Sequence, residues 1–445
     1  MFLKKWFPLF LCLISFDLAA QSYHGLLSDG YAGVHNVMSN PAFLSGMPYR
    51  TDINLLGASA FVGNDYYGVV LKDAVKSDYD FSTQAKKSPS SSNNLFGNLD
   101  VLGPSFSIRL GERTTMAVFT RGRAWVNLGE INGETFENTS SEFDANADYT
   151  IEEGDFDAQG HAWSEIGLSF GTVLTETEHS VFRVGASVKY LQGYANSYVQ
   201  GTNVSIDYDA NGILLPNGQT VGSIASSGQI TYGYSTDFQS YVFDRAGTGF
   251  GVDMGLVYEW RKARTLPYTL QMGVSLMDVG SITFDAGIEK RYDITNSVSQ
   301  EEVDSADGLL NLFDSYYTEL TRNSIETAQL PMALRLTTDY RFGTKWHLNL
   351  NAQISMVSAT EINASRVIDR YAVTPRFQTK WLSVYSPLSI SEHLGFQWGA
   401  GFRLGPLYVG SGSILSVFMG NDTMGADVYA GLKVPIFSPQ KGELN

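Results

Sequence analysis

The stretch KWHLNLNAQISMV, residues 345–357, decides the fold because apolar and polar side chains alternate along it without a break. Every second residue from Trp346 to Met356 is apolar, and the residues between them, from His347 to Ser355, are polar. A period of two over this length predicts a β-strand with one apolar and one polar face. The stretch is longer than the roughly five or six residues typical of strands in soluble sheets.

The same alternation recurs along the chain, for example in GFGVDMGLVYEWR (residues 249–261) and ADVYAGLKVPIF (residues 426–437). We therefore predict fourteen strands, at residues 51–62, 101–110, 114–126, 161–175, 179–200, 247–261, 268–279, 330–342, 345–357, 369–378, 381–390, 394–404, 406–416 and 425–437.

The connections between these strands are strongly unequal in length. Those after every even-numbered strand up to the twelfth are tight turns, such as GT at residues 343–344 and GP at 405–406. The long connections follow the first, third, fifth and seventh strands, at residues 63–100, 127–160, 201–246 and 280–329. A soluble sandwich also alternates, but it has short turns at both ends. The pattern favours an all-β fold, a closed antiparallel transmembrane β-barrel with short periplasmic turns and long extracellular loops.

Tryptophans support this orientation of the barrel. Trp260, Trp346 and Trp381 lie beside tight turns, where an interfacial aromatic girdle is expected. Trp125 and Trp163 are expected in the girdle at the opposite, outer rim.

The first twenty residues, Met1–Ala20, have the order of a secretory signal peptide: two lysines, an apolar run and small residues. The only cysteine, Cys12, lies in that run, so the mature chain is expected to have no disulfide and no thiolate. We divide the rest into an N-terminal segment at 21–48, the barrel at 49–437 and a tail at 438–445.

Composition narrows the classes of function. The formal net charge is −16, which argues against nucleic acid as a partner because such binding relies on lysine and arginine. No run of eighteen apolar residues occurs, which excludes helical membrane spans.

Four motifs carry a family resemblance: MSNPAFLSG (38–46), GVSLMDVGSITF (273–284), LPMALRLTTDY (330–340) and GAGFRLGPLYVGSGSI (399–414). Together they resemble an uncharacterised family of Bacteroidota outer-membrane proteins. That family is similar to the FadL-like superfamily of fourteen-stranded barrels, which includes fatty-acid transporters and the PorV and PorP proteins of type IX secretion.

The resemblance implies that the N-terminal segment, residues 21–48, is a plug within or beneath the lumen. Its centre is the short apolar turn Asn40, Pro41, Ala42, Phe43 and Leu44, in which Asn40 is a good N-cap and Pro41 suits the first helical position. We expect this turn to lie beside the glycine-rich strands near residues 399–412. The alternative is a periplasmic segment packed on the rim.

The polar faces of the strands predict which side chains face the lumen: Arg335, Asp339, Arg341, His347, Asp253, Glu259, Arg403 and Lys433, together with Arg109, Arg183, Lys189, Arg261 and Asp427. Charges of both signs on facing walls favour a paired network over an open selective pore.

Two long connections have a character of their own. Residues 129–160 hold ten acidic residues and no lysine or arginine, which predicts either a solvated surface or a site for calcium or a cationic partner. Within 201–246, DYDANG (207–212) starts like a calcium loop, but Gly218 stands where the bidentate glutamate belongs.

Residues 301–322 predict an amphipathic helix, with apolar residues spaced by three and four: Leu309, Leu310, Leu312, Phe313, Tyr316, Tyr317 and Leu320. Its apolar face could form a lid, a docking surface or a contact with neighbouring loops.

The sequence contains no recognisable catalytic set. None of the six histidines lies in an H-E-x-x-H pattern, so we expect no metal, no cofactor and no enzymatic activity. Two functions stay open. The first is an accessory or scaffold component of an envelope assembly or secretion system, which would need a protein partner. The second is a FadL-like transporter of a hydrophobic or small amphiphilic molecule. Both place the chain in outer-membrane lipid.

Overall fold

The computed structural model describes residues 23–68, 80, 84–134, 146–214, 218, 220–235, 245–264, 266–285, 287–306, 308–324, 327–358, 361–418 and 424–437. Within these residues the main sheet is a closed antiparallel β-barrel of 14 strands, as the alternation predicts. The predicted signal peptide and the tail at 438–445 lie outside the described residues. No helix of the described part is long and apolar enough to cross a membrane.

The barrel strands follow one another around the wall in chain order, three of them in two pieces. They are β1 (Tyr49–Asn64), β4 with β5 (Asn93–Leu102, Ser105–Arg109), β6 (Thr114–Ile131), β7 (Tyr149–Glu176), β8 (Ser180–Leu214), β10 (Gly247–Trp260), β11 (Leu270–Phe284), β16 (Ala333–Phe342), β17 (Trp346–Ser355), β18 (Arg370–Gln378), β19 with β20 (Leu382–Tyr385, Leu388–Ser391), β21 with β22 (Gly395–Trp398, Ala400–Leu404), β23 (Leu407–Ser411) and β24 (Gly425–Phe437).

The barrel closes between its first and last strands. β1 pairs antiparallel with β24, with Ile53 opposite Val434. Closure gives every wall strand a partner on both sides and leaves no open edge, which is the condition for a sheet to lie in hydrocarbon. The six predicted tight turns join successive strands at one end, as between β16 and β17 at residues 343–345.

Side-chain burial follows the predicted alternation. In β17, Trp346 is 59% exposed while His347 next to it is 3% exposed. The outward row of that strand is apolar and the inward row is polar, as expected when lipid surrounds the barrel and polar groups fill it. Trp260 and Trp381 also point outward beside tight turns.

Trp125 and Trp163 do not belong to an outer girdle, which corrects the prediction. Both face inward and are buried, at 7% and 1% exposure. Their positions have the same parity as Arg121 and Arg123 on β6 and His161 on β7, so the alternation itself places them in the lumen. There they flank the Arg123 guanidinium at 5.5 and 4.8 Å.

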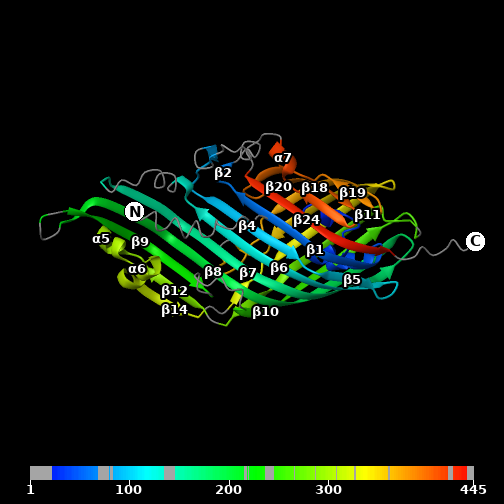
Figure 1. Ribbon diagram of the computed structural model, residues 1–445, viewed down its shortest axis with the longest axis horizontal. Coiled ribbons are helices and arrows are strands. Elements are labelled where there is room, and N and C mark those ends of the chain that lie inside the picture. The colour runs from blue at the N-terminus through cyan, green and yellow to red at the C-terminus, as the bar shows by residue number, and fades with distance from the viewer. Residues whose placement is uncertain are drawn as a thin grey trace, which may run out of the picture.

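The long strands β7 and β8, of 28 and 35 residues, continue past the barrel into an outer sheet (Figure 1). That sheet adds β9 (Thr220–Tyr234), which pairs with β8, then β12 (Ile288–Asp293) and β13 (Asn296–Ser299), which pair with β9, and β14 (Thr318–Asn323), which pairs with β12. Among the described residues, 201–246 are therefore mostly strand, and 280–329 contain strands and two short helices, because the ladder between neighbouring strands continues beyond the wall. Short strands β15 (Thr327–Gln329), β2 (Tyr67–Gly68) and β3 (Lys86–Lys87) complete the set.

Two short helices cover one face of the outer sheet: α5 (Gln300–Ser305) and α6 (Leu309–Tyr316). A capping box between Ser299 and Glu302 starts α5. α6 packs Phe313 against Tyr292 of β12, so the apolar face lies on neighbouring strands. The predicted helix is too long at its end, since Leu320 lies in β14 and is 45% exposed.

Strand β23 is also shorter than the predicted 406–416. It ends at Ser411, whose Oγ accepts hydrogen bonds from the backbone N–H groups of Ser413 and Ile414 and so turns the chain into helix α7 (Ile414–Phe418). Side-chain-to-backbone bonds of this kind compete with the sheet ladder.

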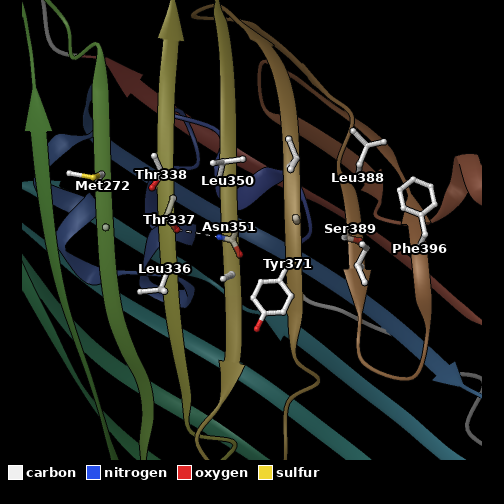
Figure 2. Close-up of a pocket in the computed structure, with 15 residues that line it drawn as sticks. Met272, Leu336, Thr337, Thr338, Leu350, Asn351, Tyr371, Leu388, Ser389 and Phe396 are labelled. Atoms are coloured by element: carbon white, nitrogen blue, oxygen red, sulfur yellow. Dashed lines mark hydrogen bonds between the residues drawn. The ribbon is translucent and has the colours of Figure 1, made fainter.

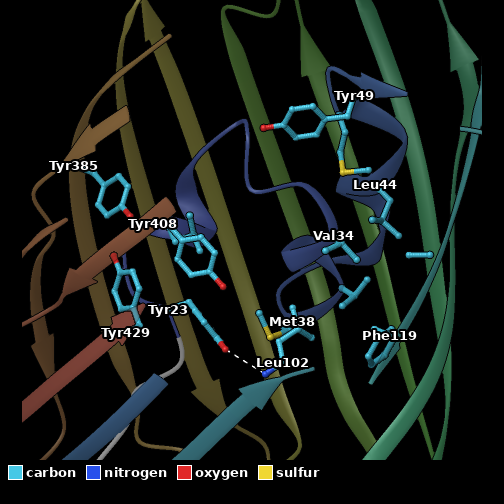
Figure 3. Packing of buried hydrophobic residues seen from close by; sticks show 14 residues of the cluster. Tyr23, Val34, Met38, Leu44, Tyr49, Leu102, Phe119, Tyr385, Tyr408 and Tyr429 are labelled. Atoms are coloured by element: carbon cyan, nitrogen blue, oxygen red, sulfur yellow. Dashed lines mark hydrogen bonds between the residues drawn. The ribbon is translucent and has the colours of Figure 1, made fainter. Parts of the chain in front are cut away.

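The N-terminal segment, residues 23–48, forms three short 3-10 helices: η1 (Leu26–Ser28), η2 (Gly33–Met38) and η3 (Pro41–Gly46). Most of its side chains are buried. They form one apolar cluster with residues of β4, β6, β19, β23 and β24. Figure 3 shows this cluster around Val34, Met38 and Leu44. The wall residues of this cluster come from both sides of the closing strand pair, from β4 and β6 and from β19, β23 and β24.

Candidate binding site in the lumen

The turn predicted at residues 40–44 is present and contacts the wall directly. Asn40 caps η3 by accepting a hydrogen bond from Ala42 N at 2.9 Å, as the sequence predicts. Its Nδ2 donates to the carbonyl oxygens of Leu256 on β10 and Val274 on β11, at 3.1 and 3.2 Å. The same Asn40 side chain thus both caps η3 and binds two strands of the wall.

The glycines beside this turn are not the ones that the sequence suggested. A Cβ on Gly273 of β11 would lie 3.0 Å from Phe43 Cζ, and one on Gly185 of β8 would overlap Ala42. The glycine-rich strands near the C-terminus instead make room for tyrosines: Gly401 and Gly410 lie against Tyr385 and Tyr429. These rings and Tyr408 surround Tyr23 at the start of the segment (Figure 3).

Charged side chains of the last strands hold the segment. Arg403 of β22 donates from Nε to Asp29 Oδ2 at 2.9 Å. Lys433 of β24 donates from Nζ to the carbonyl oxygens of Tyr31 and Ala32 at 2.5 and 2.9 Å. Both cations were predicted to face the lumen, and both are fully buried there.

A second charge network lies among β4, β6, β7, β8, β10 and β11. Lys189 Nζ bonds Asp253 at 2.7 Å and Asp278 at 2.5 Å, and Arg123 bonds Asp278 at 2.9 Å. Arg123 also bonds Glu165. Of this network the sequence predicted Asp253 and Lys189. It missed the arginines of β6, although the alternation in TRGRAW, residues 120–125, places them on the face of Trp125.

A third group lies near the tight turns. His347 Nδ1 and Arg376 Nη2 each contact Asp339, both at 2.9 Å. Glu259 pairs with Arg183 of the neighbouring strand. Of the first eight of the thirteen residues predicted to face the lumen, six are buried and paired: Asp253, Glu259, Asp339, His347, Arg403 and Lys433.

The two other predicted residues differ from these six. Arg341 lies at the β16–β17 turn and donates to the carbonyl oxygens of Gly343 and Thr344. Arg335 lines a small enclosed cavity of about 30 Å³. Its lining combines arginines and apolar residues with one carboxylate and three amides: Phe61, Phe96, Gly97, Asn98, Arg121, Arg123, Trp125, Asn127, Asp278, Ala333, Arg335, Gln353, Arg366, Val367, Ile368 and Arg370.

A larger groove, of about 680 Å³, lies on the outer surface of the wall across β11, β16, β17, β18, β20 and β21. Figure 2 shows its apolar side chains, among them Met272, Leu350, Tyr371 and Phe396, which are 42 to 59% exposed. Its volume falls within the roughly 300–1,000 Å³ of small-molecule sites. The sequence did not single out this groove, because outward rows of all strands are apolar.

The surface calcium site that the sequence left open as an alternative is not formed by the described residues. These residues contain no group of three or more His, Cys, Asp or Glu side chains able to hold a metal ion. In the calcium-like stretch, Asp207 accepts from Thr150 Oγ1 and Asp209 accepts from Asn211 N. Part of the acidic run, residues 135–145, lies outside the described residues, and residues 149–160 belong to β7.

The profile of a family of unknown function, DUF5723, matches residues 41–412 of the chain. No curated protein matches its sequence.

Among solved structures the chain is similar to the Ralstonia pickettii toluene transporter TbuX (11% identity, 92% of this chain and 95% of that one, TM-score 0.42). It is also similar to the P. putida toluene transporter TodX (12% identity, 92% and 95%, TM-score 0.43). A weaker likeness is to outer membrane phospholipase A of Escherichia coli (11% identity, 87% and 98%, TM-score 0.23). Since all these TM-scores are below 0.5, nothing about this chain's substrate follows from them.

Proposed function

The chain belongs to DUF5723, a family of unknown function, and we propose that it is an outer-membrane transporter of a small hydrophobic or amphiphilic molecule. In this proposal residues 23–48 are a plug that must move during transport. The observation that carries it is the apolar groove, which lies on the opposite side of the wall from that segment.

A single layer of β-strands separates the groove from the N-terminal segment. At Gly273 this layer has no side chain. Gly273 lines the groove. On its inner side, the position of a Cβ would lie 3.0 Å from Phe43 Cζ and 3.2 Å from Asn40 Nδ2. A molecule in the groove is therefore separated from the proposed plug only by backbone. Movement of the segment would open space directly behind the groove.

The interior supports a gated route over an open pore. Within the described residues, inward charges of the wall are paired and the N-terminal segment packs against the wall, so we expect no wide water-filled channel. The polar contacts of the segment can exchange for water, because many of its acceptors are backbone carbonyl groups, as at Tyr31 and Ala32. The apolar outer surface, including Leu350, Val373 and Ile390 at 40 to 60% exposure, suits outer-membrane lipid.

A disulfide that ties down the proposed plug tests this directly. A Cβ on Gly412 would lie 3.3 Å from His24 Cβ, near the roughly 3.8 Å separation found in disulfides. His24→Cys with Gly412→Cys would fix the start of the segment to the wall, while β1 already fixes its end. The matched control is Thr114→Cys with Thr172→Cys, which joins β6 to β7 at positions whose Oγ1 atoms are 2.9 Å apart.

Uptake of radiolabelled aromatic hydrocarbons and medium-chain fatty acids is measured in cells that lack other such transporters. The wild type and the control pair are expected to take up at least one probe in both redox states. The tethered pair should lose uptake when oxidised and regain it when reduced. Equal uptake in both states would show that the segment need not move. No uptake of any probe by the wild type would overturn the transporter proposal.

A substitution in the groove tests whether this surface takes part in uptake. Ala352 lies in it on β17, and Ala352→Phe should fill it and reduce uptake several-fold. Val428→Phe, on the outward row of β24 at a site 57% exposed, is the control and should have no effect. Equal losses in both variants would point to a general effect on the barrel.

One observation favours the accessory or scaffold function as a second candidate. β14 stands at the far side of the outer sheet from β9, and all six of its residues are exposed. A strand presented in this way could receive a protein partner. Affinity purification from native outer membranes, with the wild type and with residues 318–323 replaced by glycine and serine, tests it. A partner retained by the wild type and lost by the variant would support this function.

A further inference from the structure

Two arginines of the lumen are left without an ion pair in the described part of the chain. Arg335 of β16 and Arg370 of β18 form no ion pair within the described part of the chain. Arg370 is 7% exposed, and its Nε and Nη1 have no hydrogen-bond partner. Nε of Arg335 is likewise buried and unpaired.

The sheet register places these two side chains in one row. Arg335 is opposite Gln353 of β17, and Gln353 is opposite Arg370. All three point into the lumen and line the same cavity. Strands lie about 4.8 Å apart, so the two arginine backbones are roughly 10 Å apart and their long side chains can converge on one small group. Ser391, next in the row, is buried, and its Oγ also has no partner.

The acids nearby are already used. Asp278 bonds Arg123 and Lys189, and Glu392 bonds Arg366. Asp427 accepts hydrogen bonds from Ser411 and Ser413 and from Gly412 N. An arginine cannot lose its charge in a protein, and a buried charge without a partner is costly. The two guanidinium groups moreover repel each other.

The cavity limits what could compensate these charges. Phe61, Phe96, Trp125 and Ile368 border it on its apolar sides, and its volume of about 30 Å³ is small. Only a compact group fits without movement of the surrounding chain.

We propose that Arg335 and Arg370 form a buried binding site for one compact monovalent anion, a halide or a single carboxylate. The two guanidinium groups would donate to it from either side. The site is independent of transport, because it needs no movement of the N-terminal segment.

The test compares the full-length barrel, refolded in detergent, in bromide, formate or gluconate at equal ionic strength. Gluconate is too large for the cavity and serves as the anion-free reference. The fraction unfolded is followed by denaturant titration with heat-modifiable gel mobility. The variants are Arg335→Met, Arg370→Met and the double variant. The matched control is Arg341→Met, on the same strand as Arg335 but bonded to turn carbonyls.

In the wild type and in Arg341→Met, an anion at 100 times its Kd should lower the unfolding equilibrium constant about 100-fold relative to gluconate. A larger stabilisation in bromide than in formate would indicate a halide site, and the reverse would indicate a carboxylate site. The double variant should show no anion dependence, and Arg370→Met should be at least as stable as the wild type in gluconate because a repulsion is removed. Bromide-soaked crystals should show anomalous density between the two arginines.

Two results would overturn the proposal. One is the same anion response in the wild type and the double variant. The other is a loss of stability in Arg370→Met that is equal in all three anions, which would mean that Arg370 has a purely structural role.

Discussion

Asp29 and Arg403 form an ion pair, Oδ2 to Nε at 2.9 Å, in which both side chains are fully buried. The pair joins the N-terminal segment to β22. Arg403→Met would leave the Asp29 carboxylate buried without its ion-pair partner, which is expected to cost about 3–5 kcal/mol. The free energy of unfolding, measured by denaturant titration in detergent, gives the loss.

A second substitution checks the cause. Adding Asp29→Asn to Arg403→Met should recover part of the loss, because no buried charge is then left alone. Arg322→Met is the control, since its pair with Glu319 is largely exposed and worth less than about 1 kcal/mol. Equal losses for the two arginines would contradict the argument.

Gly33 is a position where a side chain cannot be accommodated. Its φ is +70°, and a Cβ there would overlap the Asp52 carboxylate, which accepts a hydrogen bond from Val34 N at 2.8 Å. Gly33→Ala is expected to destabilise the docked segment by about 2 kcal/mol or more. Faster protease cleavage within residues 23–48 is the readout. Gly30→Ala meets only the flexible end of Gln378, and cleavage at the wild-type rate is expected.

Phe313 is the main apolar anchor of α6. It is 4% exposed and packs on Tyr232 and Tyr292. Phe313→Ala should cost about 3–5 kcal/mol locally. The outer sheet should then become sensitive to protease, while the heat-modifiable gel mobility of the barrel stays unchanged. Leu310→Ala, at a site 41% exposed on the same helix, should leave the cleavage rate near that of the wild type.

Glu153 gives the outer part of β7 a pH dependence. Burial raises the pKa of its carboxyl from the ordinary 4.5 to about 7, although Asn132 N donates to it at 2.9 Å. The folded chain therefore holds this proton more tightly than the unfolded chain does. Its contribution to stability is complete below about pH 4.5, falls as the pH rises to about 7 and is constant above that.

The difference in unfolding free energy between the wild type and Glu153→Gln should accordingly change between pH 4.5 and 7. The exposed neighbour Glu152 provides the control, and the difference between the wild type and Glu152→Gln should stay flat. A flat difference for Glu153→Gln as well would show that the Glu153 carboxyl is solvated.

Alternation of side chains was sufficient to predict the barrel wall, because lipid outside and polar groups inside impose opposite faces on each strand. It placed Trp346 outward and His347 inward correctly. The same rule, applied to Trp125, would have placed that residue in the lumen; the girdle expectation failed because it used residue type in place of parity. The family profile matches the chain, whereas a Bacteroidota origin and a relation to PorV stay predictions.

The outer sheet and the cavity could not be read from the sequence. Outside the membrane no lipid imposes an apolar row on one face of each strand, so β9 and β12 do not carry the long unbroken apolar–polar alternation of the wall. Arg335 was predicted to face the lumen, but its lack of a partner depends on where Gln353 and Arg370 stand in the register, and pairing between strands leaves no mark in a single sequence.

The contact between Asp29 and Arg403 spans 374 positions of the chain. During synthesis, residues 23–48 precede their partners on β22 and β24 by nearly the whole length of the barrel. The segment consequently has no complete binding surface until the final strands have been added and β24 has paired with β1. Contacts of such long sequence separation are slow to form. The docking of this segment is thus a late folding event, and its protection from protease would report that assembly of the barrel is finished.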